Sequence, residues 1–216
     1  MRNKFLFFTG WLIAATLTVK SQDEATPQYL FDQLSDVRIS GFGGTMTEFS
    51  LVEGEFAVSQ GGGGAVIFNQ KFFIGGYGMG LATMHRRNDL PDYGNLILAF
   101  GHGGLWSGYL FNSWKLLHFG ASLQAGGGSI SLQDEYMVIQ DELAYDIVFV
   151  GIPKIMLELN VTRWFKLSAD VGYRYVSGVD SRSYLNENGV VRPFYRNKDF
   201  NSPFIGLSLM FGGFKQ

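Results

Sequence analysis

The sequence lacks cysteine, is poor in charge and contains only three histidines. Without cysteine there are no disulfides, thiolate zinc sites or cysteine nucleophiles. Charged residues make up 17% of the chain and the formal net charge is −2, so the basic surface of a nucleic-acid-binding protein is missing. Low charge also argues against a coiled coil or a charged disordered chain.

Long hydrophobic runs are missing as well. Residues 5–19 form the one extended apolar segment, and 15 residues fall short of the roughly 20 that a transmembrane helix needs. Arg2 and Lys4 precede this segment, and Val19 and Ser21 fit the small-residue positions of a signal-peptidase site. We therefore predict a cleaved signal peptide over 1–21, a periplasmic extension over 22–36 and a barrel over 37–216. An uncleaved anchor is the alternative.

Glycine and aromatic residues dominate what is present. Glycine accounts for 29 of 216 residues, about 13% against a usual ~7%, and aromatics reach 16%. Repeated glycine in strand-like segments indicates bulges, strong curvature or close packing, all of which a small barrel needs. The glycine runs lack the Lys-Ser/Thr of a phosphate-binding loop. The composition therefore predicts an all-β protein.

The later strands alternate clearly between apolar and polar residues. The apolar side of these strands comprises Leu117, Phe119, Ala121, Leu123, Ile147, Phe149, Ile155, Leu157, Leu159, Val161, Phe165, Leu167, Ala169, Val171, Tyr173, Tyr175, Ile205, Leu207, Leu209 and Phe211. The other side carries glycine and polar side chains. Four earlier strands are expected at about 37–48, 54–68, 72–84 and 93–111, but their glycines leave the facing ambiguous.

The connections alternate between short and long. Short connections are expected after residues 68, 111 and 161, and longer ones at 49–53, 85–92, 133–144 and 179–199. Outer-membrane barrels combine tight periplasmic turns with larger external loops and an even number of strands. The sequence thus predicts an eight-stranded antiparallel up-and-down transmembrane β-barrel with periplasmic N- and C-termini.

Aromatic residues gather where interfacial girdles are expected. One group adjoins the short turns and the other lies towards the opposite rim: Phe68, Phe72, Tyr109, Phe111, Trp114, Trp164 and Phe165, then Tyr93, Tyr145, Tyr175 and Phe204. The pair Asn188-Gly189 in the last loop indicates a hairpin. It suggests that the last two strands continue above the membrane.

The chain resembles small eight-stranded outer-membrane barrels of Gram-negative bacteria, and more narrowly an uncharacterised family of exported barrels. Four stretches carry the resemblance: GFGG at 41–44, FIGGYGMGL at 73–81, YLFNS at 109–113, and LELNVTR at 157–163 running on to YRYVSG at 173–178. The resemblance implies fold and location but no catalytic residues or cofactor. Many such barrels end on an aromatic residue that the barrel-assembly machinery recognises, whereas here Lys215 and Gln216 follow Phe214.

Charges of both signs are expected inside the barrel. They form a predicted lumen network of Lys154, Glu158, Lys166, Asp170 and Arg174. An eight-stranded barrel is just wide enough for side chains to fill, and buried charges require partners. We expect Glu158 to pair with Lys166 or Arg174 and the lumen to be blocked.

Surface binding is assigned to loops 85–92, 133–144 and 179–200. The candidate residues are Arg86, Arg87, Tyr184, Arg192, Tyr195 and Arg196. Arg86 and Arg87 could bind lipopolysaccharide phosphates, or they could form local ion pairs with Asp89 and Asp92. The acidic residues of the 133–144 loop lack calcium-loop spacing, so no metal site is predicted.

The function predicted is therefore a structural or surface-interaction role, in a monomer that contacts outer-membrane lipids. A lipid-modifying enzyme is one alternative, but His118 and Ser122 on one strand are about 13 Å apart, too far for a nucleophile and its base. His102, among glycines, is expected to be structural. The other alternative is a soluble exported lipocalin-like binder, which would carry its apolar residues inside.

Overall fold

The computed structural model describes residues 37–87, 96–134, 144–180, 183–185 and 191–214. The signal peptide and the extension predicted over 1–36 lie outside these residues and stay predictions. The described part of the chain contains no helix with the length and hydrophobicity needed to cross a bilayer.

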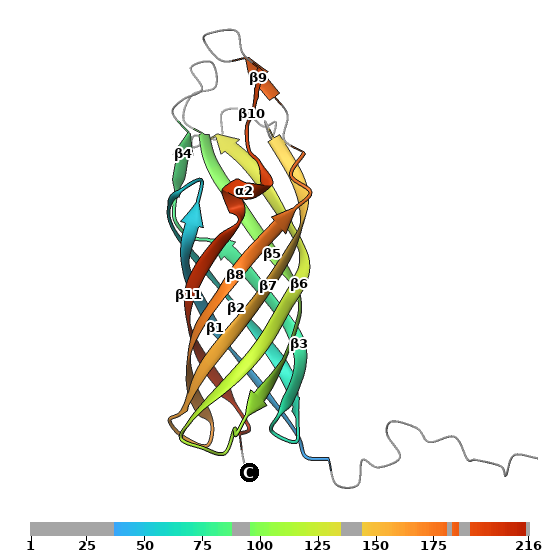
Figure 1. Cartoon of the computed structure of the whole chain (residues 1–216), viewed down its shortest axis with the longest axis vertical. Helices are drawn as coiled ribbons and strands as arrows, with labels where there is room; N and C mark the ends of the chain where they lie inside the picture. Colours follow the sequence, from blue (N-terminus) through green and yellow to red (C-terminus); the bar gives the residue numbers. More distant parts are fainter. Residues whose placement is uncertain (1–36, 88–95, 135–143, 181–182, 186–190, 215–216) are drawn as a thin grey trace, which may run out of the picture. The chain divides into compact units, whose positions relative to one another are not determined.

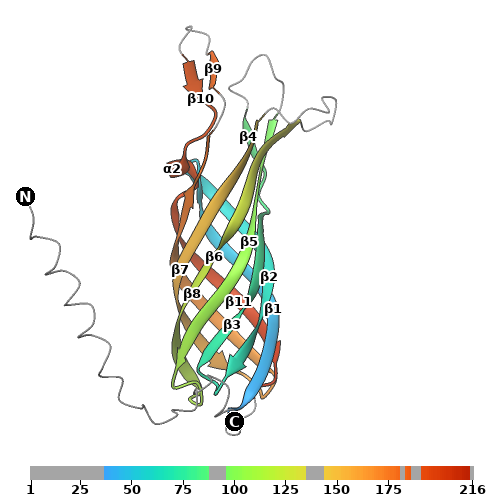
Figure 2. The same cartoon turned by 90° about the vertical axis from the view of Figure 1, so that its right-hand side faces the viewer.

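Eight long antiparallel strands form one closed sheet in the described residues (Figures 1 and 2). They are β1 (Ile39–Val52), β2 (Glu55–Phe68), β3 (Phe72–Leu81), β5 (Leu96–Phe111), β6 (Leu117–Asp134), β7 (Ala144–Asn160), β8 (Phe165–Ser177) and β11 (Ser202–Gly212). Each strand pairs with its neighbour in the chain, β11 pairs with β1, and β3 pairs with β5. The predicted all-β, eight-stranded up-and-down barrel is confirmed.

The two ends of the barrel differ. One end, here called the short-turn end, carries the turns at 69–71, 112–116 and 161–164, the start of β1 and the end of β11 (Figure 1). The other end, the long-loop end, carries three short extra elements and a short helix: β4 (His85–Arg87), β9 (Ser183–Leu185), β10 (Val191–Pro193) and α2 (Asn197–Phe200). The hairpin indicated by Asn188-Gly189 is present as β9–β10, a separate two-stranded sheet. It does not continue β8 and β11.

The expected longer connection at 49–53 is wrong. Val52 pairs directly with Glu55, so only Glu53 and Gly54 join β1 to β2. Both have positive φ, 53° and 83°, as in the type I′ hairpin turn that matches the twist of paired strands. The strict alternation of short and long connections therefore holds only from the second hairpin onward.

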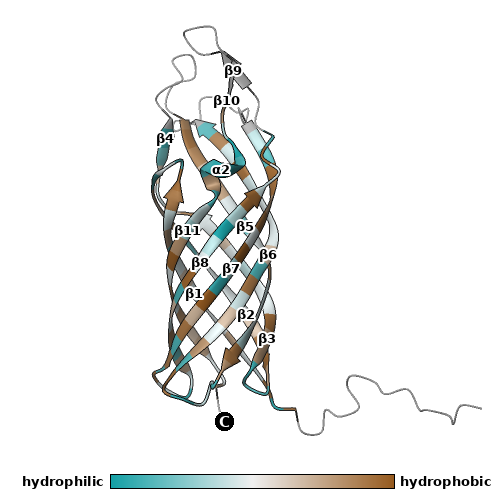
Figure 3. Ribbon diagram, in the orientation of Figure 1, coloured by the Kyte–Doolittle hydropathy of each residue, from teal (hydrophilic) through white to brown (hydrophobic). Residues whose placement is uncertain are grey.

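The outer surface of the barrel is apolar. Residues predicted to face outward do so, including Ile147, Ile155 and Ile205, whose exposed fractions are 74%, 59% and 61%. Their neighbours in sequence, such as Lys154 and Asp146, point inward or are half-buried. Hydrophilic positions gather at the short turns and at β4 and α2 (Figure 3). A bilayer admits strands only as a closed barrel with an apolar exterior, so these are transmembrane strands.

The structure settles the facing of the earlier strands. Two clusters of buried apolar side chains lie inside the barrel, and β1, β2 and β5 contribute to both. The first, towards the long-loop end, includes Leu96, Leu98, Phe100, Val150 and Ile152. The second, towards the short-turn end, includes Ile67, Phe73, Trp106, Leu110 and Met156. Apolar residues thus occupy both faces of these strands, which is why alternation alone left their facing undecided.

Glycine makes room for the large inward side chains, and this generates a test. A Cβ at Gly108 would lie 2.5 Å from the Phe73 ring, whereas one at Gly78 would meet nothing within 4 Å. Gly108→Val is expected to destabilise the barrel by about 1–3 kcal/mol through overpacking, and Gly78→Val to be tolerated. Urea unfolding in lipid vesicles measures both. Equal stability of the two variants would contradict the packing described here.

Candidate functional site in the barrel interior

One group of buried ionic contacts lies near the short-turn end of the interior. Glu158 of β7 accepts from Lys166 Nζ of β8 at 3.1 Å and lies 3.0 Å from His118 Nε2 of β6. All three side chains are buried. The Lys166 ammonium lies over the ring of Phe214, 4.5 Å from its centroid. Glu158 is thus held from two sides, and Lys166 is one of its two expected partners.

A second ionic group lies farther along the interior. Asp170 accepts hydrogen bonds from Ser168 at 2.6 Å and Ser208 at 3.2 Å. Lys154 Nζ approaches the same carboxylate at 3.9 Å and lies 5.3 Å from the centroid of a Trp106 ring. Both charged groups therefore have a counter-charge within the barrel.

Arg174 lies elsewhere, because the register places it six residues beyond Ser168, the cross-strand partner of Glu158. Six residues of strand span about 20 Å, so Arg174 does not reach Glu158. Its Nε donates to Phe200 O at 3.0 Å and its Nη2 to Leu51 O at 3.2 Å. Arg174 therefore ties the wall of the barrel to α2 and to the end of β1.

Glu48 is an interior charge that the sequence analysis missed. It is 1% exposed and interacts electrostatically with Lys154 and Arg174. Both of its carboxylate oxygens, together with His102 Nε2 and Gln124 Oε1, lack a hydrogen-bond partner among the described residues. The spacing of Met46, Glu48 and Ser50 is the signal that could have found it. Glycines earlier in β1 obscured that spacing.

The long-loop end of the interior is apolar and is covered by the segment before β11. Phe194, Tyr195 and Phe200 are buried there, with the Tyr195 and Phe200 ring centroids 5.5 Å apart. Phe200 also packs on Phe100 of β5, at 5.3 Å between centroids. The expectation that Tyr195 lies on the surface is wrong, because its side chain joins this apolar cluster. Phe204, expected in the outer girdle, also faces inward and is 4% exposed.

The other predicted surface residues lie at the long-loop end. Arg86, in β4, and Arg196, immediately before α2, are exposed. Arg87, Tyr184 and Arg192 lie in β4, β9 and β10, with Arg192 opposite Tyr184 in the hairpin register, but their side chains are outside the described residues. Most of loops 85–92 and 133–144 also lies outside them.

The histidines and serines of the barrel interior are the candidates for a catalytic pair. His118 faces Glu158 and the Lys115 carbonyl, while Ser122 Oγ donates to Met156 Sδ at 3.6 Å. His102 lies against Tyr77, with Nδ1 3.4 Å from the hydroxyl. No group of three or more metal-ligating side chains is found in the described part of the chain. None of these contacts pairs a serine with a histidine, as serine hydrolysis requires.

The buried pair at Glu158 can be tested by removing one charge or both. Glu158→Leu leaves the Lys166 ammonium buried without its carboxylate, and we expect a loss of about 3–5 kcal/mol in the free energy of unfolding. Adding Lys166→Met should recover most of that loss. Urea unfolding in vesicles measures both, and exposed Glu55→Gln serves as a control within about 0.5 kcal/mol of wild type. A double variant as unstable as the single one would contradict this pairing.

No protein-family model matches the chain, and no curated protein matches it. Among solved structures it is similar to the attachment invasion locus protein Ail of Yersinia pestis in complex with the heparin analogue sucrose octasulfate, at 11% identity over 81% of this chain and 97% of that one, with a TM-score of 0.48. It is also similar to the N-terminal β-barrel domain of Pseudomonas aeruginosa OprF, at 11% identity over 79% of this chain and 96% of that one, with a TM-score of 0.47. A third similar structure is Neisserial surface protein A, at 12% identity over 81% of this chain and 97% of that one, with a TM-score of 0.45.

Proposed function

We propose that this protein is an outer-membrane β-barrel whose lumen is blocked by its own side chains and whose role is structural or surface-interacting. The observation that carries the proposal is the segment Pro193–Phe200 and the three aromatic side chains that it buries in the long-loop end of the interior. The short-turn end would lie in the periplasm with both ends of the barrel chain, and the long-loop end outside the cell.

Two further features support a blocked lumen. The ion pairs of Glu158 and Asp170 lie in the interior near the short-turn end and in the middle of the barrel. Their side chains are nine-tenths or more buried and fill this space. Arg174 binds the Phe200 carbonyl and so fastens the covering segment to β8. A solute would have to displace paired charges as well as an apolar cluster, and both are costly.

A barrel without a passage acts through its ends. We assign the interaction surface to loops 85–92, 133–144 and 179–200, which share the long-loop end. Arg86 and Arg196 are exposed there, and guanidinium groups bind phosphate in bidentate geometry. Lipopolysaccharide of the outer leaflet is the proposed contact, and a monomer that the assembly machinery inserts is the proposed state. The interior contacts favour no enzymatic function.

A conductance measurement tests the blocked lumen. The purified protein in a planar bilayer is expected to produce no steps of porin size, because paired charges and buried aromatic side chains occupy its axis. A large porin in the same bilayer is the positive control. Insertion is monitored separately by the heat-dependent shift of the folded band on a detergent gel. Porin-sized steps from folded protein would rule the proposal out.

Lipopolysaccharide binding tests the surface role. Arg86→Gln combined with Arg196→Gln is expected to lower the affinity of the detergent-solubilised protein for lipopolysaccharide several-fold, because two phosphate-binding guanidinium groups are lost. Lys71→Gln combined with Lys115→Gln removes the same charge from the opposite end and should lower that affinity far less. If neither pair, or both pairs equally, altered the affinity, the assignment to the long-loop end would fail.

A further inference from the structure

The short-turn end carries one exposed cation before β1 and one in each of its three turns. Arg38 precedes β1, Lys71 lies between β2 and β3, Lys115 between β5 and β6, and Arg163 between β7 and β8. All four are exposed. The four cations, here called the cationic rim, are therefore distributed around the barrel and do not cluster on one strand pair.

The described part of this end has no exposed carboxylate to neutralise the rim. Glu158 is the one acidic residue among the described residues there, and it is buried between Lys166 and His118. At the long-loop end, exposed or half-buried acids occur beside the cations, among them Glu55 and Asp199. The net positive charge is thus a property of one end of the barrel.

Each rim cation adjoins a large exposed apolar side chain. Lys71 is followed by Phe72, Lys115 is preceded by Trp114, and Arg163 is followed by Trp164. Arg38 precedes Ile39; the exposed fractions of Ile39 and Trp164 are both 60%. Aromatic side chains favour the boundary between hydrocarbon and headgroups. In a barrel that crosses a bilayer, the neighbouring cations would then lie at the depth of the lipid phosphates.

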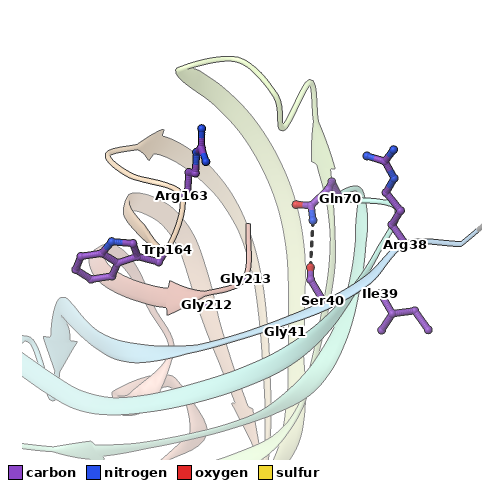
Figure 4. Close-up of a pocket in the computed structure, with 9 residues that line it drawn as sticks. All are labelled: Arg38, Ile39, Ser40, Gly41, Gln70, Arg163, Trp164, Gly212 and Gly213. Carbon is purple, nitrogen blue, oxygen red and sulfur yellow. Dashed lines mark hydrogen bonds between the residues drawn. The ribbon is translucent and has the colours of Figure 1, made fainter. Parts of the chain in front are cut away.

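Two of the rim cations border one cavity. Arg38, Ile39 and Ser40 at the start of β1, and Arg163 and Trp164 after β7, line a hollow of about 620 Å³ (Figure 4). Arg38 and Arg163 stand on opposite sides of it. Between them Gln70 Nε2 donates to Ser40 Oγ at 3.1 Å, which presents polar groups to the space (Figure 4).

A second hollow continues the rim on the other side of Arg163. It measures about 770 Å³ and is lined by Trp114, Leu116, Asn160 and Phe214, among others. Asn160 Nδ2 donates to the carbonyls of Ser113 and Lys115, at 2.9 and 2.7 Å, and so fixes the turn that carries Lys115. Arg163 therefore borders both hollows, and it faces Arg38 across the first of them.

We propose that the cationic rim binds the phosphodiester headgroups of anionic phospholipids in the adjacent leaflet, with one headgroup seated between Arg38 and Arg163. This rests on the membrane orientation proposed above. Guanidinium groups pair with phosphate oxygens, and basic groups at a membrane surface attract anionic lipid. The apolar neighbours hold the cations at the interface, so the rim selects lipid by charge and also fixes the depth of the barrel.

The chain itself contains a competing anion. Residues 22–36 precede the rim in sequence and contain four carboxylates, at Asp23, Glu24, Asp32 and Asp36, and no cation. Lipid is favoured as the occupant because exposed aromatic or aliphatic side chains adjoin all four cations, and such side chains suit a lipid interface better than a polar peptide. A variant with the four acids changed to Asn or Gln separates the two occupants.

Spin-labelled lipids provide the test. The full-length protein, folded in phosphatidylcholine vesicles, is expected to bind spin-labelled phosphatidylglycerol several-fold more strongly than spin-labelled phosphatidylcholine. Arg38→Gln with Arg163→Gln should bring that preference close to one, because both guanidinium groups of the proposed seat are lost. The preference should also weaken with added salt. Lys198→Gln, which changes an exposed cation of α2 at the long-loop end to which no binding role is assigned, is the control and should retain it.

Each other outcome counts against the proposal. Folded protein without a preference, or with one that survives loss of Arg38 and Arg163, would overturn it while leaving the barrel and its blocked lumen intact. A preference seen only after the four acids of 22–36 are neutralised would show that the chain's own segment occupies the rim. Failure to fold in vesicles, seen on the detergent gel, would instead contradict the proposed membrane function.

Discussion

Backbone hydrogen bonding is the constraint on which this structure depends. In hydrocarbon an unpaired N–H or C=O costs several kcal/mol, so a membrane sheet must close on itself. Here β3 pairs with β5 and β1 with β11, which leaves no free edge among the long strands. Pro153, which has no N–H, lies where the β7–β8 pairing is interrupted between Gly151 and Lys154, yet it remains in register with Leu123 of β6. The wall tolerates a proline because its other side stays paired.

Closure of eight strands leaves a narrow interior, and two halves of the barrel wall, each made of four strands, fill it with different side chains. Strands β6, β7, β8 and β11 contribute most of the charged and small polar groups, such as His118, Lys154 and Asp170. Strands β1, β2, β3 and β5 contribute bulky apolar groups such as Phe73 and Trp106, with glycines as the positions against which they pack. Glu158 and Asp170 obtain their lysine partners from β7 and β8, whereas Glu48 on β1 interacts with Lys154 and Arg174 of the opposite half of the wall.

This division explains how far the sequence alone could predict the structure. On β8, on β11 and on the halves of β6 and β7 nearest the short-turn end, the inner face is mostly polar or small and the outer face is apolar. The period-2 pattern was therefore sufficient to orient Leu167, Val171, Leu207 and Leu209 outward. On β1 to β5 glycine and apolar residues lie on both faces, and this obscured the spacing that could have placed Glu48 inside. The inward positions of Tyr195 and Phe204 depend on the fold of the last loop into the barrel. Contacts between residues so distant in sequence leave no periodic signal.

The interior also changes character along the barrel axis, and this bears on where function can reside. Ionic pairs lie near the short-turn end, whereas Leu96, Ile130, Val150 and Phe200 make the long-loop end apolar. The proposed blocked lumen follows from this gradient, because the apolar cluster fastened by Arg174 lies at one end and buried charges with partners resist rearrangement at the other. On that proposal the barrel acts as a rigid support and recognition is left to its two ends, the long loops on one side and the cationic rim on the other.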